Sequence, residues 1–284
     1  MYIADGWKDY ELIDCGNGDK FERWGDVTLL RPDPQAIWPM EPCAPHAKYH
    51  RASTGGGSWE FLRALPESWE IKYRDLRFIV RPTGFKHTGL FPEQAVNWDW
   101  MRGLIEQAGR PVSVLNLFAY TGGATAACLK AGAGVVHLDA AKGMIAWAKD
   151  NAAASGLSNA PVRYIVDDAM KFVLREARRK KSYDAVIMDP PSYGRGPTGE
   201  MWKIEDGLFP LVTACADLLS QNPLFFLINS YTTGLAPTVL KNVLDIALIS
   251  RFGGRAEASE VALPCSRRNI LLPCGASGRW TAKG

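Results

Sequence analysis

The sequence has no apolar run long enough to cross a membrane and no paired-cysteine motif. Its longest apolar run, residues 224–228, is far shorter than the roughly 20 residues that a membrane-spanning helix needs. The six cysteines form no C-x-x-C pair, and the opening residues MYIAD lack the basic start and apolar block of a signal peptide. We therefore expect reduced thiols, no membrane partner and a cytoplasmic protein.

A strong excess of charge of one sign is also missing. The chain carries 33 lysine and arginine residues against 30 aspartate and glutamate residues, which gives a net charge of +3. An extended contact with nucleic-acid phosphates usually leaves a stronger basic signature, so the charge neither requires nor excludes RNA as a partner. The hydrophobic share of 47% and the length of 284 residues are ordinary for a globular protein with one large domain, or with one domain and an appendage.

Residues 112–139 have the pattern of the βαβ unit in which a G-x-G-x-x-G fingerprint usually lies, but the turn of this stretch lacks that triple-glycine spacing. In this stretch an apolar strand leads into a glycine turn, an alanine-rich helix follows, and a second strand ends at Asp139. The turn consists of Ala119, Tyr120, Thr121, Gly122 and Gly123.

The composition of this turn indicates the kind of ligand that it would take. A glycine turn lets a ligand approach the backbone closely, and an acid at the end of the second strand can accept hydrogen bonds from both hydroxyls of a ribose. Because the turn lacks the triple-glycine spacing that cradles a pyrophosphate, a cofactor without phosphate fits better. The pattern favours S-adenosylmethionine at the carboxyl ends of parallel strands.

A second motif follows another apolar strand, at residues 183–188. This strand runs into Asp189, Pro190, Pro191, Ser192 and Tyr193. FAYTGG comes before this DPPSYG segment, and Asp139 and Asp168 lie between the two. In this order the segment resembles the D-P-P motif of class I S-adenosylmethionine-dependent methyltransferases, especially a family related to the 23S rRNA base methyltransferases. The resemblance covers residues 81–231.

The resemblance implies an α/β fold with a Rossmann-like class I methyltransferase sheet, mostly parallel, whose C-terminal strand is antiparallel. Residues 255–263 and 269–272 can form its terminal antiparallel pair. The N-terminal part differs, because its short strands are expected between glycine- and proline-rich turns, at residues 10–14, 27–31, 69–73 and 76–80. We expect a small β-rich N-terminal module over residues 1–82 and a methyltransferase domain over residues 83–284. A flexible turn or exposed loop is expected at residues 53–58, and a polar loop at residues 195–203.

The N-terminal module has two features that bear on its partners. Its arginines lie among aromatic residues, a composition that suits RNA, although a lid that only shields the cofactor is an equal alternative. Cys43, His46 and His50 have C-x2-H-x3-H spacing, but no fourth ligand is evident. We therefore assign no metal and expect the imidazoles of His46 and His50 to contact backbone groups or substrate.

The resemblance also implies which residues contact the cofactor. The segment TGFKHTGLFPEQAVN resembles the family's K-T-G-x-F turn, so Thr88 and Gln94 are expected at the methionine end; a helix cap and a surface amide are the structural alternatives. The acid that accepts from the adenine amino group is placed at Asp168, with Ala169, and helix capping at Asp167, unless the two acids exchange roles. The implied cofactor site comprises Thr88, Gln94, Asn116, Phe118, Ala119, Tyr120, Thr121, Gly122, Gly123, Asp139, Ala140, Asp168, Ala169 and Asp189.

The expected catalytic residues are Asp189, Pro190, Pro191 and Tyr193. Asp189 and the carbonyl of Pro190 can accept hydrogen bonds from an exocyclic amine and hold its lone pair toward the methyl group. Tyr193 can stack on a flipped base. In amino-methylating enzymes an aromatic residue directly follows the second proline, whereas here Ser192 lies between Pro191 and Tyr193. Together with the family resemblance, these roles imply methylation of a base in RNA, with ribosomal RNA as the first candidate.

Several alternatives stay open. Methylation at cytosine C5 needs a thiolate, and no cysteine lies beside DPP or directly after the strand expected at residues 224–229. Cys215 has the spacing of a core residue, so this chemistry would require Cys265 to fold back into the site. The acceptor could be a small molecule or a protein, or the chain could bind RNA or adenosine compounds without catalysis. The cations at residues 175–181 either complement a helix dipole or form an RNA phosphate patch. Asn151 is expected to make a structural hydrogen bond.

Overall fold

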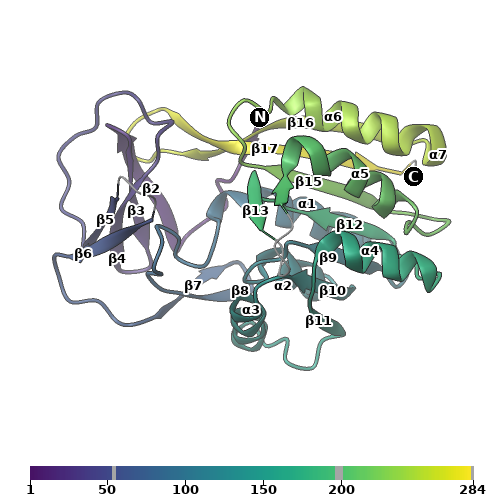
Figure 1. Cartoon of the computed structure of the whole chain (residues 1–284). Coiled ribbons are helices and arrows are strands. Elements are labelled where there is room, and N and C mark those ends of the chain that lie inside the picture. The colour runs from purple at the N-terminus through teal and green to yellow at the C-terminus, as the bar shows by residue number, and fades with distance from the viewer. Residues whose placement is uncertain (53–55, 196–200, 283–284) are drawn as a thin grey trace. The chain divides into compact units, whose positions relative to one another are not determined.

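The computed structural model describes residues 1–52, 56–195 and 201–282 (Figure 1). The internal contacts divide the chain into two compact units. Unit 1 comprises Met1, Asn97–Val261 and Gly275–Gly284, and unit 2 comprises Tyr2–Val96 and Ala262–Cys274. The expected boundary at residues 82 and 83 therefore lies inside unit 2, which also includes a segment from near the C-terminus. The division into two domains stays a prediction.

Unit 1 is built on a twisted sheet in which the described strands follow the order β16-β17-β15-β12-β9-β10-β11. Five of these strands are mutually parallel, and β17 pairs antiparallel with β15. The strands are β9 (Ser113–Leu117), β10 (Gly134–Asp139), β11 (Val162–Val166), β12 (Ala185–Met188), β15 (Phe225–Ser230), β16 (Arg255–Pro264) and β17 (Leu271–Thr281). The predicted fold, a mostly parallel sheet with an antiparallel C-terminal strand, is confirmed.

The helices of unit 1 cover both faces of this sheet. They are α1 (Ala95–Gln107), α2 (Gly123–Lys130), α3 (Lys142–Ala154), α4 (Ala169–Arg178), α5 (Ile204–Ala216), α6 (Pro237–Leu244), the π-helical turn η2 (Asp245–Ile249) and α7 (Ser250–Phe252). Successive side chains of a strand point to opposite faces. Phe226 accordingly joins the core formed by α4, α5 and α6, whereas the ring of Phe225 contacts Trp100 of α1.

The central strands β12 and β15 are buried along their whole length because both of their faces are covered. All four residues of β12 are buried, and so are all six of β15. Near-continuous apolar strands of this kind are typical of parallel sheets between two helix layers. The layers leave the strand ends as the accessible parts of the sheet, and these ends carry the polar motifs found in the sequence.

Unit 2 contains a five-stranded sheet in the order β2-β3-β4-β5-β6 and a two-stranded sheet of β7 and β8. Only the β4–β5 pair among these strands is parallel. The strands are β2 (Tyr10–Gly16), β3 (Asp19–Trp24), β4 (Val27–Pro32), β5 (Ala47–Arg51), β6 (Gly57–Phe61), β7 (Trp69–Tyr73) and β8 (Leu76–Val80). The short strand β1 (Tyr2–Ile3) and the 3-10 turn η1 (Pro92–Gln94) complete its elements.

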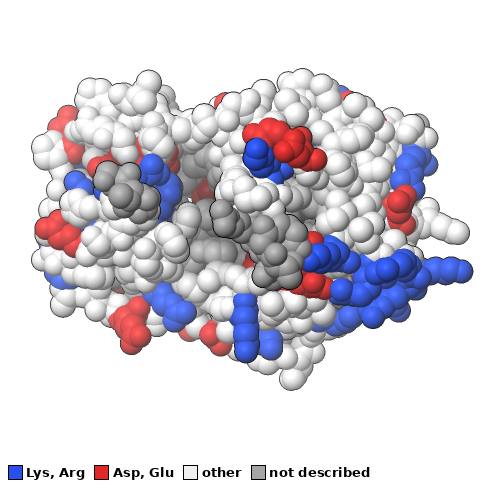
Figure 2. Space-filling model, in the orientation of Figure 1, with Lys and Arg blue, Asp and Glu red and all other residues white. Residues whose placement is uncertain are grey.

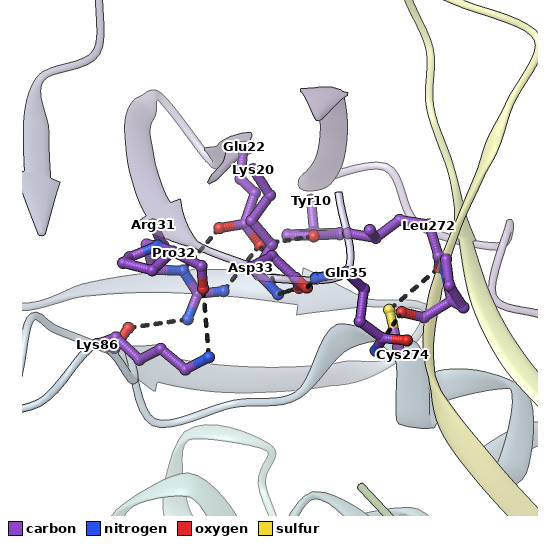
Figure 3. A network of polar contacts seen from close by, with 11 residues as sticks. Tyr10, Lys20, Glu22, Arg31, Pro32, Asp33, Gln35, Lys86, Leu272 and Cys274 are labelled. Carbon is purple, nitrogen blue, oxygen red and sulfur yellow. Dashed lines mark hydrogen bonds and ion pairs between the residues drawn. The ribbon is translucent and has the colours of Figure 1, made fainter. Parts of the chain in front are cut away.

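A buried network of charged side chains crosses the five-stranded sheet of unit 2 (Figure 3). The Glu22 carboxylate accepts two hydrogen bonds from the Arg31 guanidinium, at 2.6 and 2.8 Å, and one from the Tyr10 hydroxyl at 2.8 Å. Lys20 lies between this carboxylate and Asp33, 3.4 Å from the latter. The charges therefore satisfy one another inside the unit.

Four of the eight described strands of unit 2 were predicted from the sequence, and four were not. The four others are β1, which has only two residues, and β3, β5 and β6, whose sequences are polar or lack strict alternation of apolar and polar residues. The loop expected at residues 53–58 lies partly outside the described residues, and its described end, Gly57 and Ser58, starts β6. Similarly, the ends of the loop expected at residues 195–203 form paired strands, β13 (Tyr193–Arg195) and β14 (Met201–Lys203), while residues 196–200 lie outside the described part.

The C-terminal strand is much longer than expected. The sequence predicts a strand at residues 269–272, but β17 extends over 11 residues to Thr281. Glycine lowers strand propensity, but Gly278 is required at its position, because a Cβ there would lie 2.9 Å from the Cβ of Leu240 in α6. No helix within residues 1–52, 56–195 and 201–282 is long and apolar enough to cross a membrane.

Candidate functional site

The strand register of unit 1 brings the sequence motifs to one edge of the sheet. Leu117 of β9 is in register with Leu138 of β10 on one side and with Met188 of β12 on the other. The residues that follow these strands therefore come together at their carboxyl ends: the turn after Leu117, Asp139 and Asp189. The chain order also reverses between β9 and β12, and ligands of open α/β sheets bind at such a switch point.

The turn after β9 has a strained backbone. Phe118 and Tyr120 both adopt left-handed conformations, with φ of 54° and 50°. Bulky residues rarely do so, and such strain gathers at ligand sites. The turn is fixed from both sides, because the amide of Ala119 donates to Leu138 at 3.0 Å and that of Tyr120 donates to Asp139 at 2.9 Å.

The two glycines of the turn have separate structural reasons. Gly122, with φ of 85°, is the N-cap of α2 and provides no side-chain cap. Gly123 lies against Trp98, whose ring would be only 2.6 Å from an added Cβ. The first amide groups of α2 are thus directed toward the strand ends without a capping side chain, which suits hydrogen-bond acceptors of a ligand.

Asp139 ends β10 with capacity for a ligand left on its carboxylate. Each oxygen accepts one backbone N–H: Oδ2 from Tyr120 at 2.9 Å and Oδ1 from Ala141 at 2.8 Å. A carboxylate offers about four acceptor positions, so about two remain for ligand hydroxyls. Burial raises the pKa of Asp139 above its ordinary value, and the two backbone hydrogen bonds only partly offset this. The neighbouring Ala140 is exposed.

The two acids after β11 do not divide their tasks as expected. Asp168 is the N-cap of α4, and its Oδ1 accepts from the amide of Lys171 at 2.9 Å. Asp167 instead pairs with Arg175 and accepts from the amide of Asp168 at 2.9 Å. The assignment of the helix cap to Asp167 was therefore wrong. Ala169 begins α4 and is buried, and the second oxygen of Asp168 stays available for a ligand.

Asn116 and Thr121 take part in buried hydrogen bonds behind the turn. The amide nitrogen of Asn116 donates to Thr125 at 2.9 Å, and the Thr125 hydroxyl lies 2.8 Å from Nδ1 of His137. Burial lowers the pKa of His137 to about 4, so this imidazole is neutral at neutral pH. Asn151 donates to the carbonyl of Thr121 at 2.8 Å, which confirms its predicted structural hydrogen bond.

The segment after β12 turns away from the sheet into the hairpin of β13 and β14. Asp189 is half-buried, Pro190 is buried, and Pro191 is exposed. Ser192 is fixed through its side chain and its backbone: its hydroxyl lies 2.6 Å from that of Thr232, and its carbonyl accepts from the amide of Ile204 at 3.1 Å. Tyr193 begins β13 with 52% of its surface exposed.

Trp202 of β14 connects this segment to the turn after β9, a role that the sequence analysis missed. Its Nε1 donates to the carbonyl of Pro191 at 2.6 Å, and its ring lies 5.6 Å from that of Phe118, centroid to centroid. Gly207 makes room for the indole, because an added Cβ would lie 2.5 Å from the ring. Among the described residues no donor reaches the carbonyl of Pro190, so that acceptor is left for a ligand.

A second missed cluster holds the end of β15. Asn97 of α1 donates to Asn229 at 3.1 Å and to Ser277 at 2.8 Å, and it accepts from Arg279 at 2.6 Å. The Arg279 guanidinium also lies 4.9 Å from the centre of the Trp100 ring. Four residues from three distant segments thus fix the strand end beside Asp189. Only their polarity in apolar surroundings could have marked them in the sequence.

Thr88 and Gln94 belong to unit 2, and both are buried. Gln94 lies in η1, so the alternative of a surface amide was wrong. Thr88 caps no helix, and its hydroxyl has no hydrogen-bond partner among the described residues. A buried hydroxyl of this kind can bind a ligand, but the contact of either residue with the cofactor stays a prediction.

The cysteine and histidine residues have structural surroundings. His46 accepts from the amide of Thr28 at 3.1 Å, and His50 lies 2.7 Å from Glu60. No group of three metal-ligating side chains occurs in the described ranges. Cys215 is fully buried in α5 among core residues, as predicted, and Cys265 lies in unit 2 with its thiol on the carbonyl of Ile13.

Comparison with known proteins shows which family of enzymes has this arrangement at the carboxyl ends of the strands. The family model of S-adenosylmethionine-dependent methyltransferases matches residues 46–214. The chain belongs to this family. The crystal structure of an S-adenosylmethionine-dependent methyltransferase from Agrobacterium tumefaciens agrees, with a TM-score of 0.94 and 36% identity over 99% of this chain and 93% of that chain.

Curated relatives of this methyltransferase include ribosomal RNA large subunit methyltransferases K/L. That of Syntrophotalea carbinolica is 27% identical over 65% of this chain, and that of Shewanella frigidimarina is 32% identical over 51%. The alignments cover 25% and 20% of these relatives, so the chain spans about a quarter of their length at most.

The strand edge of this methyltransferase fits its cofactor, S-adenosylmethionine. The spare acceptor positions of Asp139 suit the two ribose hydroxyls, and the backbone N–H groups at the uncapped start of α2 suit hydrogen-bond acceptors of the cofactor. Asp168 has one oxygen left beyond its capping bond for an amino group. The cofactor supplies an electrophilic methyl group, and the residues beside it must orient the acceptor.

Proposed function

We propose that this methyltransferase methylates an exocyclic amine of a base in RNA, with large-subunit ribosomal RNA as the first substrate to test. The observation that carries the proposal is the different use of two neighbouring carbonyls. Trp202 occupies that of Pro191, whereas no described donor reaches that of Pro190. An exocyclic amine has two N–H groups, and Asp189 with the Pro190 carbonyl offers two acceptors one residue apart.

In this arrangement Asp139 would bind the ribose of the cofactor, and Asp168 with Ala169 its adenine. The turn from Phe118 to Gly123, together with Asn116 and Ala140, would shape the pocket, and Thr88 and Gln94 would contact the methionine end. Asp189 and Pro190 would accept the two N–H groups and hold the nitrogen lone pair toward the methyl group. A bond forms between the acceptor nitrogen and the methyl carbon as the bond between that carbon and the cofactor sulfur breaks, and the nitrogen then loses one proton to solvent. The enzyme would accelerate this transfer mainly by positioning the two reactants.

Exposed side chains near the DPP segment, residues 189–191, support a base as the acceptor. Tyr193 is 52% exposed, Met201 54% and Tyr231 37%, and all three follow or border the DPP segment in unit 1. Exposed aromatic rings stack on nucleobases that have left their helix. The names of the curated relatives support ribosomal RNA in particular, and six free thiols fit action in the cytoplasm.

Cytosine C5 methylation has less support. That reaction needs a thiolate that adds to the ring. Burial raises the pKa of Cys215 far above its ordinary value and that of Cys128 to about 12, so both are inert thiols inside the core. The proposed amine chemistry needs no thiolate.

The test is methyl transfer from labelled S-adenosylmethionine to large-subunit ribosomal RNA transcribed in vitro, followed by mass spectrometry of its nucleosides. We expect an N-methylated nucleoside, and a loss of about 10²–10³-fold in kcat for Asp189→Ala with cofactor affinity retained. Label on a carbon atom would contradict the amine chemistry. Label only on proteins or small metabolites of a cell extract would contradict an RNA acceptor, and cofactor binding without any acceptor would indicate a binding protein.

A further inference from the structure

The positive charge of the chain is concentrated in one segment of unit 1. Residues 163–181 contain seven lysine and arginine residues and three aspartate and glutamate residues, a net charge of +4. The whole chain has a net charge of only +3, so the other 265 residues together carry −1. Figure 2 shows the result as a continuous blue surface over α4. A local excess of this kind is the electrostatic footprint of a polyanion site.

The cations of this segment are exposed and only partly neutralised. Arg178, Arg179, Lys180 and Lys181 are all exposed at the end of α4, which buries Phe172 and Val173 on its other side. Arg179 pairs with Glu176 at 3.4 Å. For Arg178, Lys180 and Lys181, the described residues provide no acidic partner within ion-pair distance.

The helix dipole accounts for part of this charge but not for all of it. Cations in the last turn of a helix interact favourably with its dipole, and the effect fades within that turn. Arg175 and Arg178 are in the last turn. Lys180 and Lys181 lie beyond it, and Lys171 lies in the first turn, where a cation opposes the dipole.

The backbone at the end of α4 provides an independent sign that a cation is favoured there. The amide of Lys180 donates to Ala177 at 2.9 Å and that of Lys181 to Glu176 at 3.1 Å, which is the Schellman arrangement. Lys180 therefore takes the left-handed position, with φ of 53°. At the same position α1, α2 and α3 have glycines, in the order Gly109, Gly132 and Gly156. Only α4 of these four helices places a charged side chain where glycine is the unstrained residue.

We propose that this surface, formed by Arg178, Lys180 and Lys181 with the flanking cations of α4, binds the phosphate backbone of the RNA substrate. The inference rests on the proposed function and extends it, because α4 starts at Asp168 on the cofactor edge and leads away from it. A helix of 10 residues is about 15 Å long, so the surface would hold RNA beyond the methylated nucleotide. It contributes affinity without reading sequence.

The first test measures binding of unmodified large-subunit ribosomal RNA, transcribed in vitro, as a function of salt. The triple variant Arg178→Gln, Lys180→Gln, Lys181→Gln should bind at least about tenfold more weakly at low salt. Its slope of log affinity against log salt should fall by about 2, since each lost phosphate contact removes roughly 0.7. A matched variant neutralises three other surface cations of unit 1, the half-buried Lys241 and the exposed Arg251 and Arg255 (Lys241→Gln, Arg251→Gln, Arg255→Gln), and should change neither quantity.

The second test uses the strained backbone. Lys180→Gly should raise Tm by ~2 °C because glycine relieves the left-handed strain, and it should nevertheless weaken RNA binding by about threefold. Lys180→Arg should keep wild-type binding. A more stable protein with unchanged RNA affinity would overturn the proposal.

The outcomes separate this inference from the proposed function. If wild-type protein methylates RNA and the α4 triple variant binds it with the same affinity and salt slope, only the phosphate surface is refuted, and an acidic protein becomes the better partner for it. Equal loss in the matched variant would also refute it, since the effect would then be one of net charge. If wild-type protein neither binds nor methylates the RNA while it binds S-adenosylmethionine, the RNA function itself is wrong.

Discussion

Two carboxylates, Glu22 in unit 2 and Asp139 in unit 1, lie in opposite electrostatic surroundings. Glu22 is fully buried and is neutralised by side chains: Arg31 donates two hydrogen bonds and Tyr10 one (Figure 3). Burial alone would raise the pKa of Glu22, but the charges of Arg31 and Lys20 reverse this, so the pKa lies below its ordinary value.

Within the described part of the chain, Asp139 accepts hydrogen bonds from uncharged donors, the backbone amides of Tyr120 and Ala141. No cation of this part offsets its burial, so its pKa lies above the ordinary value. The comparison separates two uses of a buried acid. A carboxylate that the chain itself neutralises holds the fold together, whereas one that is left with unused acceptor positions is prepared for a ligand.

The largest effect should come from breaking the neutralised pair. Glu22→Gln leaves Arg31 buried without a counter-charge, and removal of one partner of a buried pair costs about 3–5 kcal/mol. We expect a loss of that size in the free energy of unfolding, measured by urea denaturation. Glu60→Gln is the matched control in the same unit, because Glu60 and its partner His50 are half exposed. It should change stability by less than about 1 kcal/mol. Equal losses for both variants would show that burial of the network is energetically unimportant.

The second effect concerns ligand affinity rather than stability. Asp139→Asn replaces one acceptor oxygen by a donor, which removes hydrogen bonds to a ribose worth about 1.5–3 kcal/mol each. We expect about 10²-fold weaker binding of S-adenosylmethionine in calorimetry, while the free energy of unfolding changes by no more than about 1–2 kcal/mol. Asp150→Asn, at an exposed position of α3, should leave affinity unchanged. Wild-type affinity of the Asp139 variant would remove the distinction between the two acids.

The two carboxylates also differ in how well their roles can be predicted from the sequence. Asp139 ends an apolar strand at a defined distance from a glycine turn, and both signals are local, so the site residue could be named without a structure. The strand expected at residues 183–188 is likewise present, as β12 at Ala185–Met188. Nothing local identifies Glu22 as a buried residue, because its partner Arg31 lies on the next strand and β3 itself was missed.

Other features escaped the sequence because they depend on distant contacts or on a single torsion angle. Trp202 and Phe118 are 84 residues apart, and no spacing rule connects them. Asp167 and Asp168 are adjacent acids, and only the extended backbone of Asp168 decides that it is the cap. The strand β17 contains Pro273 and two glycines, which lower strand propensity, and its pairing with β15 is what makes it a strand.

A smaller effect is expected where a neutral donor, rather than a carboxylate, prepares the site. Trp202→Phe keeps a ring beside Phe118 but removes the donor to the Pro191 carbonyl. One such hydrogen bond is worth about 0.5–1.5 kcal/mol, so kcat for methyl transfer should fall by about 3–10-fold. The KM for S-adenosylmethionine should stay within about twofold, because the indole acts on the acceptor loop.

Trp100→Phe is the control for this change. Trp100 packs on Phe225 and Arg279 rather than on the loop after β12, so its replacement should lower stability and leave kcat unchanged. A fall in kcat that is no larger for Trp202→Phe than for Trp100→Phe would show that the indole contributes only packing.

The smallest effect at ordinary pH, and the one that sharpens the comparison most, is the pH dependence of cofactor binding. The pKa of Asp139 is raised, so its contribution to folding stability is fully present below the ordinary pKa of about 3.9 and is lost as pH rises through the raised pKa. The pKa of Glu22 is lowered, so its contribution is present above about 4.3 and is lost only as pH falls through the lowered pKa.

Cofactor binding follows Asp139 in the other direction, because the ionised carboxylate is the better acceptor for two hydroxyls. Calorimetry from about pH 7 down to about pH 4.5 should therefore show weakening affinity for S-adenosylmethionine in a protein whose Glu22 network still stabilises the fold. Asp139→Asn should flatten that profile, and in urea denaturation it should remove the Asp139 part of the pH dependence of stability while the part from Glu22 is retained. An unchanged profile in the variant would place the titration elsewhere, and the raised pKa of Asp139 would then reflect its burial alone and not its use as a ligand acceptor.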